Sequence, residues 1–195
     1  NARLLEERDH RMAELSAFNQ IGVALVGHQD LESTLSNILR RVSGLFQVEA
    51  VSLMLLEEDG LHFAVAIGGG AEEIKSFVLK PGQGIAWSVV EKRQSIRVDN
   101  VKADARHFSD IDAAINFTTH SLLAVPVQIH NRVLGVIEVM NRQDGLPFSQ
   151  DNQVTLEFIA SAVAVVLENA RLFEETQRQL KTLTALTQAS EAITK

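Results

Sequence analysis

The last part of the chain, from Gln150 to Lys195, contains neither glycine nor proline. Because these two residues are the strong helix breakers, nothing local stops a helix from propagating, and at about 1.5 Å per residue it would reach roughly 70 Å. Ser149 is a suitable N-cap, and Asp151 places a negative charge in the first turn, where the helix dipole favours it. The first half is apolar on nearly all sides, which predicts a helix that starts buried against a folded domain.

The second half of this stretch narrows to one apolar stripe with the alternating four- and three-residue spacing of a parallel coiled coil. Its apolar positions are Leu172, Leu183, Leu186 and Ile193, and its polar interruptions are Thr176, Gln179 and Ser190. A seam with this many polar positions is weak by itself. We therefore expect the helices to pair only when a folded domain holds them together, as in a switchable connector.

The segment Asn169–Glu175, NARLFEE, repeats the NARLLEE with which the chain begins. When the two are superimposed, the seam maps onto Leu4, Leu15, Phe18 and Leu25. Such a repeat predicts a piece of a longer protein in which a connecting helix recurs between similar domains. The alternative is chance similarity between two helices of like composition.

The composition excludes several classes of function. The net charge is −7 and the basic residues are spread along the chain, which argues against nucleic-acid binding. The longest apolar run, Ile159–Leu167, is shorter than the ~20 residues that span a bilayer, and no signal peptide opens the chain, so we expect no membrane contact and a cytoplasmic location. The absence of cysteine excludes disulfides, thiolate nucleophiles and thioether-linked chromophores.

Hydrophobic periodicity predicts an amphipathic helix, capped by Asp30 and ending near Phe46, followed by about six strands. The predicted strands are Val48–Glu57, Leu61–Gly68, Ser76–Leu79, Ser95–Val98, Ser121–Ile129 and Val133–Asn141, with a short helix at Ile85–Lys92. The fold class is α+β: an antiparallel sheet with helices on one face and an irregular segment on the other. We expect a domain at 28–168 between connecting helices at 1–27 and 169–195.

The segment Asp99–Thr119 has the weakest periodicity, with one or two helical turns expected around Ser109–Phe117. Long irregular segments of compact domains are often binding lids. We therefore expect this segment to cover a binding site.

Five segments, taken in order, resemble the motifs of GAF domains. They are Lys80–Ala86, Asp104–Phe108, Ser121–Val127, Leu134–Val139, and Asn141-Arg142 followed by Phe148-Ser149. The resemblance covers roughly Leu31–Glu174. It implies a small-molecule-binding or dimerising regulatory module of a signalling protein, often found in tandem and joined by parallel helices to catalytic output domains.

GAF domains that bind cyclic nucleotides carry an Asn-Lys…Phe-x3-Asp-Glu signature, and this chain matches it at Asn141 and Phe148. Arg142 replaces the lysine, and the amides Asn152-Gln153 replace the two carboxylates. The substitution removes the charge with which Arg142 would pair, unless Asp151 takes that role. We therefore do not expect a cyclic nucleotide as ligand.

The resemblance places a ligand pocket between the sheet and the irregular segment. The candidate lining residues are Phe63, Val65, Gly84, Ile85, Trp87, Phe108, Ile111, Phe117, Ser121 and Glu138. Gly82-Gln83-Gly84 could present backbone N–H groups to an anion, or could simply form a tight turn from strand to helix.

The residue spacing predicts neither a metal site nor an enzyme. No histidine pair has the four-residue spacing of helical metal ligands, and His107 and His120, which flank the irregular segment, are the two worth testing. The aspartates of that segment, among them Asp104 and Asp112, are interpreted as caps and solvated loop residues. No arrangement of nucleophile and base is visible.

These observations predict a non-catalytic sensory module that forms a homodimer through its terminal helices. It would relay a conformational change to neighbouring GAF or output domains, such as the histidine kinase of a two-component system or a nucleotide cyclase. The alternative is a structural spacer whose pocket is filled by its own side chains. The sequence names neither the ligand nor the output domain, and it does not give the direction of signalling.

Overall fold

The computed structural model describes residues 28–193, with side chains described over 31–182. Its centre is a six-stranded antiparallel sheet in the order β3-β2-β1-β6-β5-β4. The strands are β1 (Val48–Glu57), β2 (Gly60–Gly68), β3 (Val78–Leu79), β4 (Ile96–Val98), β5 (Leu122–Ile129) and β6 (Arg132–Arg142). The helices are α2 (His28–Phe46), α3 (Gly84–Lys92), α4 (Ser109–Ala114) and α5 (Gln150–Ile193), with 3-10 turns η1 (Ile74–Ser76) and η2 (Val101–Ala103). The predicted α+β class is confirmed.

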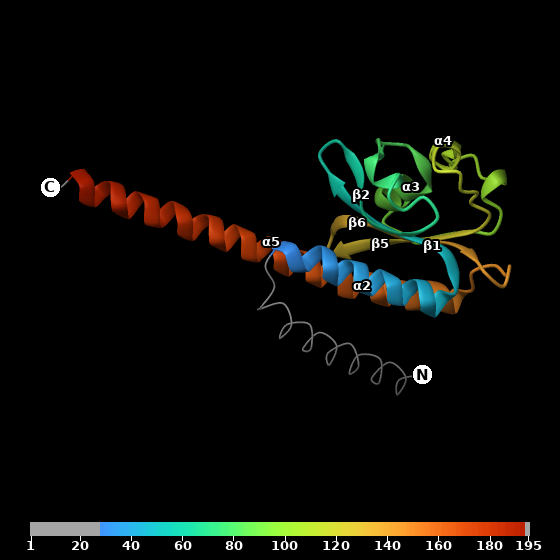
Figure 1. Cartoon of the computed structure of the whole chain (residues 1–195). Helices are drawn as coiled ribbons and strands as arrows, with labels where there is room; N and C mark the ends of the chain where they lie inside the picture. The colour runs from blue at the N-terminus through green and yellow to red at the C-terminus, as the bar shows by residue number, and fades with distance from the viewer. Residues whose placement is uncertain (1–27, 194–195) are drawn as a thin grey trace, which may run out of the picture. The chain divides into compact units, whose positions relative to one another are not determined.

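The two faces of the sheet are covered differently, as predicted. Helix α2 and the part of α5 up to Ala164 lie on one face, and α3 and α4 lie on the other (Figure 1). Side chains alternate between the faces along each strand. Leu53 and Ile137 face each other across β1 and β6, and both are fully buried. Met54 and Val136, one residue along, belong to the core on the α3 side.

A β-bulge in β2 reverses the alternation within that strand. Leu53 pairs with Val65, but the next residue of β1, Met54, pairs with Phe63, so Ala64 is the extra residue. Phe63 therefore belongs to the core on the α3 side, and Val65 shares the opposite face with Leu53. Val65, expected to line the pocket together with Phe63, therefore lies on the other face, because a bulge is set by the pairing and not by the strand's own pattern.

Several local expectations needed correction. The third strand is only two residues long, because Ile74–Ser76 form a 3-10 turn before it. Helix α2 already includes His28, so Asp30 lies inside the helix and not at its cap.

The start of α5 is capped as predicted. The backbone N–H of Asn152 donates to the Ser149 hydroxyl at 3.1 Å, and the Ser149 N–H donates to the Asn152 side chain at 2.9 Å. This reciprocal capping satisfies two donors at a helix end. It fixes where the long helix begins.

The chain divides within α5. One compact unit is Gly27–Ala164, whereas the remainder of α5 belongs to a second unit. The predicted seam residues Leu4, Leu15, Phe18 and Leu25 lie outside the described residues, as do the side chains of Leu183, Leu186 and Ile193. The coiled-coil pairing therefore stays a prediction. None of the helices in the described part of the chain has an apolar stretch of the length that a bilayer requires.

The packing of α5 against the sheet predicts a large effect at one position of this helix. Leu156 is fully buried, whereas Val154 on the same helix is 50% exposed. We expect Leu156→Ala to lower the free energy of unfolding by about 3 kcal/mol, because it leaves a cavity in a close-packed core. Val154→Ala is the control, expected within about 0.5 kcal/mol of the wild type. Urea denaturation measures both, and equal effects would contradict this packing.

Candidate functional site

A cavity of about 70 Å³ lies between the sheet and the segment 99–119, which we call the lid. The sheet contributes Ser52, Phe63, Leu122, Glu138 and Met140. The lid contributes His107, Phe108, Ile111, Asp112 and Thr119, and the start of α3 contributes Gly84, Ile85 and Ala86. Most of these side chains are apolar, so the few polar ones would determine which ligand the cavity accepts.

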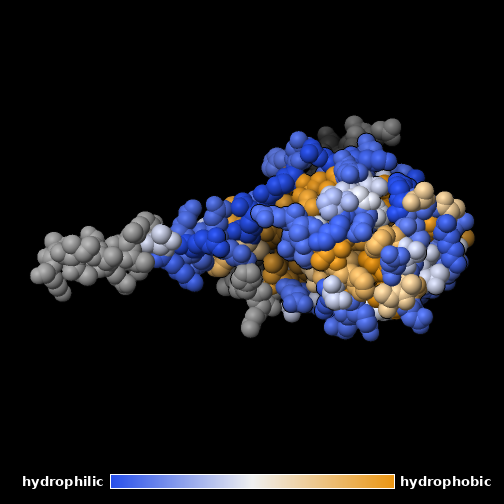
Figure 2. Space-filling model, turned by 90° about the horizontal axis from the view of Figure 1, so that it is seen from above, coloured by the Kyte–Doolittle hydropathy of each residue, from blue (hydrophilic) through white to orange (hydrophobic). Residues whose placement is uncertain are grey.

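Figure 2 looks onto the face of the domain that α3 and α4 cover, where hydrophobic residues reach the surface among hydrophilic ones. Trp87, Phe108 and Ile115 are half-buried apolar residues that pack against the core on this side. Of these three, Phe108 lines the cavity, so a half-buried side chain borders the cavity on this side.

Glu138 is the buried acid of the cavity. It lies on the central strand β6, directly opposite Ser52 on β1 and Ala124 on β5, and it is only 8% exposed. No group in the described part of the chain donates a hydrogen bond to its carboxylate. Burial, with a further contribution from the charge of Asp112, raises the pKa of Glu138 from 4.5 to about 7.

Ser52 is the second unpartnered group. Its hydroxyl is buried and has no hydrogen-bond partner in the described structure. A buried polar group without a partner costs about 1–3 kcal/mol. Two such groups, on neighbouring strands and facing the same cavity, indicate a place where a ligand would complete the hydrogen bonding.

Asp112 holds the lid together from within, and a glycine outside the lid lets it pack closely. The carboxylate of Asp112 accepts the Thr119 N–H at 2.8 Å and the Thr119 hydroxyl at 3.0 Å, and it lies 3.5 Å from Nε2 of His107. At the other side, Gly70 has a φ of +72°, and a Cβ there would come within 2.6 Å of the Ile115 side chain. The lid therefore needs glycine at this position to close.

Asn141 clamps the end of the lid. Its side-chain oxygen accepts the N–H groups of His120 and Ser121, at 2.7 and 3.3 Å. Its amide nitrogen donates to the carbonyl of Thr118 at 2.8 Å and to Glu49 at 2.7 Å. The first residue of the cyclic-nucleotide signature is thus a structural clamp, and it does not line the cavity.

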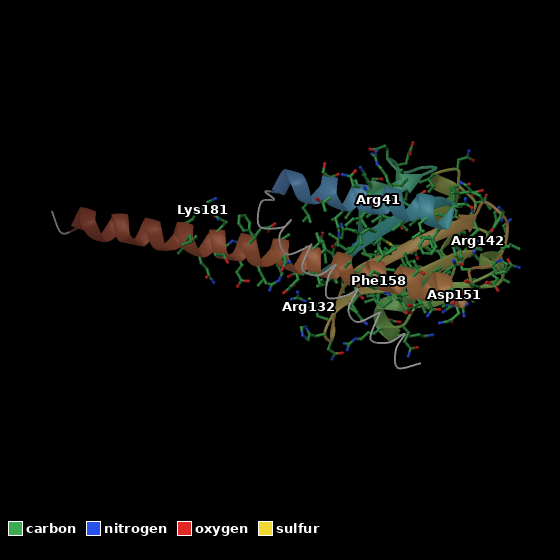
Figure 3. The ribbon with its side chains drawn as sticks, turned by 90° about the horizontal axis from the view of Figure 1, so that it is seen from below. Arg41, Arg132, Arg142, Asp151, Phe158 and Lys181 are labelled. Atoms are coloured by element: carbon green, nitrogen blue, oxygen red, sulfur yellow. The ribbon has the colours of Figure 1, made fainter. Side chains whose placement is uncertain are left out.

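The other signature residues are structural as well. Arg142 pairs with Asp144 and donates to the side chain of Asn152 at 2.7 Å. Figure 3 shows Arg142 and Asp151 at the same end of the domain, but Asp144 is the residue that supplies the carboxylate expected from Asp151. None of the signature residues lines the cavity, so their substitution does not act on a ligand there directly.

The structure brings some of the predicted pocket residues together around the cavity. Phe63, Gly84, Ile85, Phe108, Ile111 and Glu138 line the cavity. Val65, Trp87, Phe117 and Ser121 do not line it, and this corrects their placement.

The four displaced residues have separate physical reasons. The bulge at Ala64 turns Val65 to the other face of the sheet. Trp87 is half-buried on α3 and donates its indole N–H to Glu91 at 3.1 Å. Phe117 packs over Gly69, and the N–H of Ser121 is bound by Asn141.

Sequence reasoning missed Ser52 and interpreted Asp112 as a solvated residue, although both line the cavity. The signal for Ser52 was its position inside the otherwise apolar run Ala50–Leu56, on the same alternation as Met54. Asp112 had no such signal, because only the folded lid brings it toward Glu138. Of the two histidines singled out, His107 lines the cavity, whereas His120 is exposed and does not.

A second polar cluster lies on the β1–β2 turn. Glu57, Asp59 and His62 approach one another closely enough to hold a cation, with Asp59 2.6 Å from His62. The hairpin creates this proximity, which the spacing along the sequence did not indicate. The group is largely exposed, and Lys80 donates to Asp59 at 2.9 Å, so an amine already neutralises the carboxylate.

Comparisons with known proteins agree with this architecture. A family model described as "GAF domain" matches residues 30–167. The GAF domain of a phosphoenolpyruvate-protein phosphotransferase from Coxiella burnetii superposes with a TM-score of 0.70 and 16% identity, covering 84% of this chain and 96% of that structure. The corresponding Acinetobacter domain gives a TM-score of 0.66 and 19% identity, covering 85% of this chain and 98% of that structure.

Two curated relatives are much longer proteins. The "Probable 3',5'-cyclic phosphodiesterase pde-5" of Caenorhabditis elegans is 23% identical over 76% of this chain and 22% of its own length. The "Dual 3',5'-cyclic-AMP and -GMP phosphodiesterase 11" of Drosophila melanogaster is 28% identical over 74% of this chain and 11% of its own length. The chain spans less than a quarter of either relative.

The raised pKa of Glu138 predicts a pH-dependent stability. Between pH 4.5 and about 7 the folded chain holds a proton that the unfolded chain has released, so stability is fully present below the lower value and falls as the pH rises through the upper one. The loss amounts to roughly 3 kcal/mol. Relative to Glu138→Gln, which cannot ionise, the wild type should lose about this much free energy of unfolding between about pH 5 and pH 8.

Urea denaturation at several pH values measures this difference. Glu58→Gln, at an exposed position of the β1–β2 turn, is the matched control and should show no such trend. A difference between wild type and Glu138→Gln that does not change with pH would contradict the burial of an unpaired carboxyl group.

Proposed function

Since this chain belongs to the GAF domain family, we propose that it is a non-catalytic regulatory module that binds a small molecule under its lid and signals through its terminal helices. The observation that carries the proposal is the pair of unpartnered polar groups, Glu138 and Ser52, inside a mostly apolar cavity. If the pocket were filled only by its own side chains, we would not expect these two polar groups in it, because each one destabilises the folded chain.

The lid supports the same proposal. Its C-terminal end is bound to the sheet by the hydrogen bond from the Asn141 amide to the carbonyl of Thr118, and within the lid Asp112 accepts the N–H of Thr119. Polar contacts of this kind can break and re-form at low cost when a ligand enters. A ligand that binds the closed lid better than the open lid would shift the population between the two.

The signal would leave through α5. On the part of this helix beyond the compact unit, Leu172 is 46% and Phe173 is 48% exposed. Apolar side chains at these exposures favour pairing with a second copy through the seam of Leu4, Leu15, Phe18, Leu25, Leu172, Leu183, Leu186 and Ile193.

The neighbours along the chain would be further GAF domains and an output domain, for which we propose a histidine kinase or a nucleotide cyclase acting in the cytoplasm. The curated relatives named above are phosphodiesterases, a third class of output. We do not propose a cyclic nucleotide as the ligand, because a cavity of about 70 Å³ is far smaller than the ~300 Å³ or more of ordinary ligand pockets.

A second candidate function is that of a structural spacer without a ligand. The small cavity and the packing of Ile111 into the core on the α3 side favour it. The two functions differ in whether the purified protein carries a bound molecule.

Native mass spectrometry of the protein purified from its own host tests the proposal. We expect a bound small molecule that is lost in Ser52→Leu, because the larger side chain would fill the cavity while the exposed surface stays unchanged. Circular dichroism checks that the variant is folded, and Ala86→Val is a smaller filling change if it is not. No adduct under any gentle ionisation condition would favour the spacer, and a mass equal to cyclic AMP or cyclic GMP would overturn our choice of ligand class.

Sedimentation equilibrium tests the dimer. We expect the double variant Leu172→Asp, Leu183→Asp to weaken self-association at least tenfold, because it places charges in an apolar seam. Gln177→Asp, Gln188→Asp adds the same charge at outward heptad positions and should leave the dimer intact. Equal association of the two variants would locate the interface elsewhere.

A further inference from the structure

We infer that the group bound in the cavity is a small organic cation with N–H donors, such as a primary ammonium or an amidinium. This inference rests on the proposed function, because it names the chemical class of the ligand for the same cavity. The polar groups of the cavity, its charge and its size each support it.

Among the described residues, the side chains that face the cavity offer more hydrogen-bond acceptors than free donors. Asp112 is a carboxylate that already accepts two bonds from Thr119. Glu138 is a second carboxylate, and it accepts none from the described residues. The Ser52 hydroxyl, opposite Glu138 in the sheet, has an unused oxygen. A ligand with several N–H groups would therefore satisfy Glu138 and Ser52 together.

The charge of the cavity favours a cation. The titratable groups that face Glu138 are Asp112 on α4 and His107 just before it, and the sheet and α3 add no further titratable residue to the described lining. An anion would meet two carboxylates in a space of low polarity, whereas a cation would be attracted to both. Phe63 and Phe108 line the same space and can contact the face or edge of a cationic group.

The size of the cavity limits what can be buried. A volume of about 70 Å³ leaves room for a group of only a few heavy atoms. This accommodates the charged head of a molecule, while any tail would extend past the lid. A ligand head of four heavy atoms cannot bind more tightly than a Kd of roughly 40 µM, and millimolar affinity is ordinary for such fragments.

Acetamidine, acetamide and acetate form a matched set of probes, because they share a skeleton and differ in charge and donors. Chemical-shift titration of the full chain should give a millimolar Kd for acetamidine and at least tenfold weaker binding for the other two. Raising the pH from about 5.5 to about 8 should tighten the binding of acetamidine roughly tenfold or more, because Glu138 must lose its proton.

Two variants separate the role of the charge from general damage. Glu138→Gln keeps the shape of the side chain and should weaken acetamidine binding at least tenfold while abolishing the pH dependence. Its fold is not at risk, since the change removes a buried unpaired charge. Glu58→Gln, on the exposed turn, should bind acetamidine like the wild type.

The possible outcomes separate this inference from the proposed function. Equal binding of acetamide, stronger binding of acetate, or unchanged acetamidine binding by Glu138→Gln would each overturn the cation. A neutral or anionic molecule in the native mass spectrum would do the same but would leave the sensory function in place. If no probe binds and the protein from its host carries no adduct, both the cation and the sensory function are contradicted.

Discussion

The register between β1 and β6 controls both faces of this domain. It places Leu53 opposite Ile137 in the core beneath α2 and α5, and it places Ser52 opposite Glu138 in the cavity. The strands approach so closely that a Cβ on Gly135 would lie 2.0 Å from the Met54 carbonyl oxygen. A slip of one residue would carry Glu138 to the apolar face and Ile137 into the cavity, so the fold and the site depend on the same pairing.

The site occupies the middle of the sheet, where burial is most complete, and this explains its chemistry. A carboxyl group and a hydroxyl without partners oppose folding there by a few kcal/mol. The apolar side chains on the two faces offset this cost. Departures from good local packing that a fold tolerates in this way are most often found at functional sites. Among the described residues that line the cavity, Glu138 and Ser52 are such departures.

The polar residues around the cavity have a different role from those inside it. Asn141 binds four groups and joins the end of the lid to β1 and β6, while Arg142 joins the following turn to the start of α5. Both belong to the cyclic-nucleotide signature, which by sequence alone suggests that they contact a ligand. In the structure their hydrogen bonds go to the protein itself, so the selectivity of the cavity depends on the side chains of the sheet and the lid.

The sequence alone determined the antiparallel sheet, the long closing helix and the lid, because strand alternation, helix breakers and loss of periodicity are local properties. It also indicated Phe63, Phe108 and Glu138 as lining residues through the family resemblance. Only the tertiary structure decided which face Val65 occupies, that Asp112 approaches Glu138, and that Asp59 meets His62. The bulge and the lid arise from contacts between distant segments, and a local pattern reports that a side chain is buried without reporting what it is buried against.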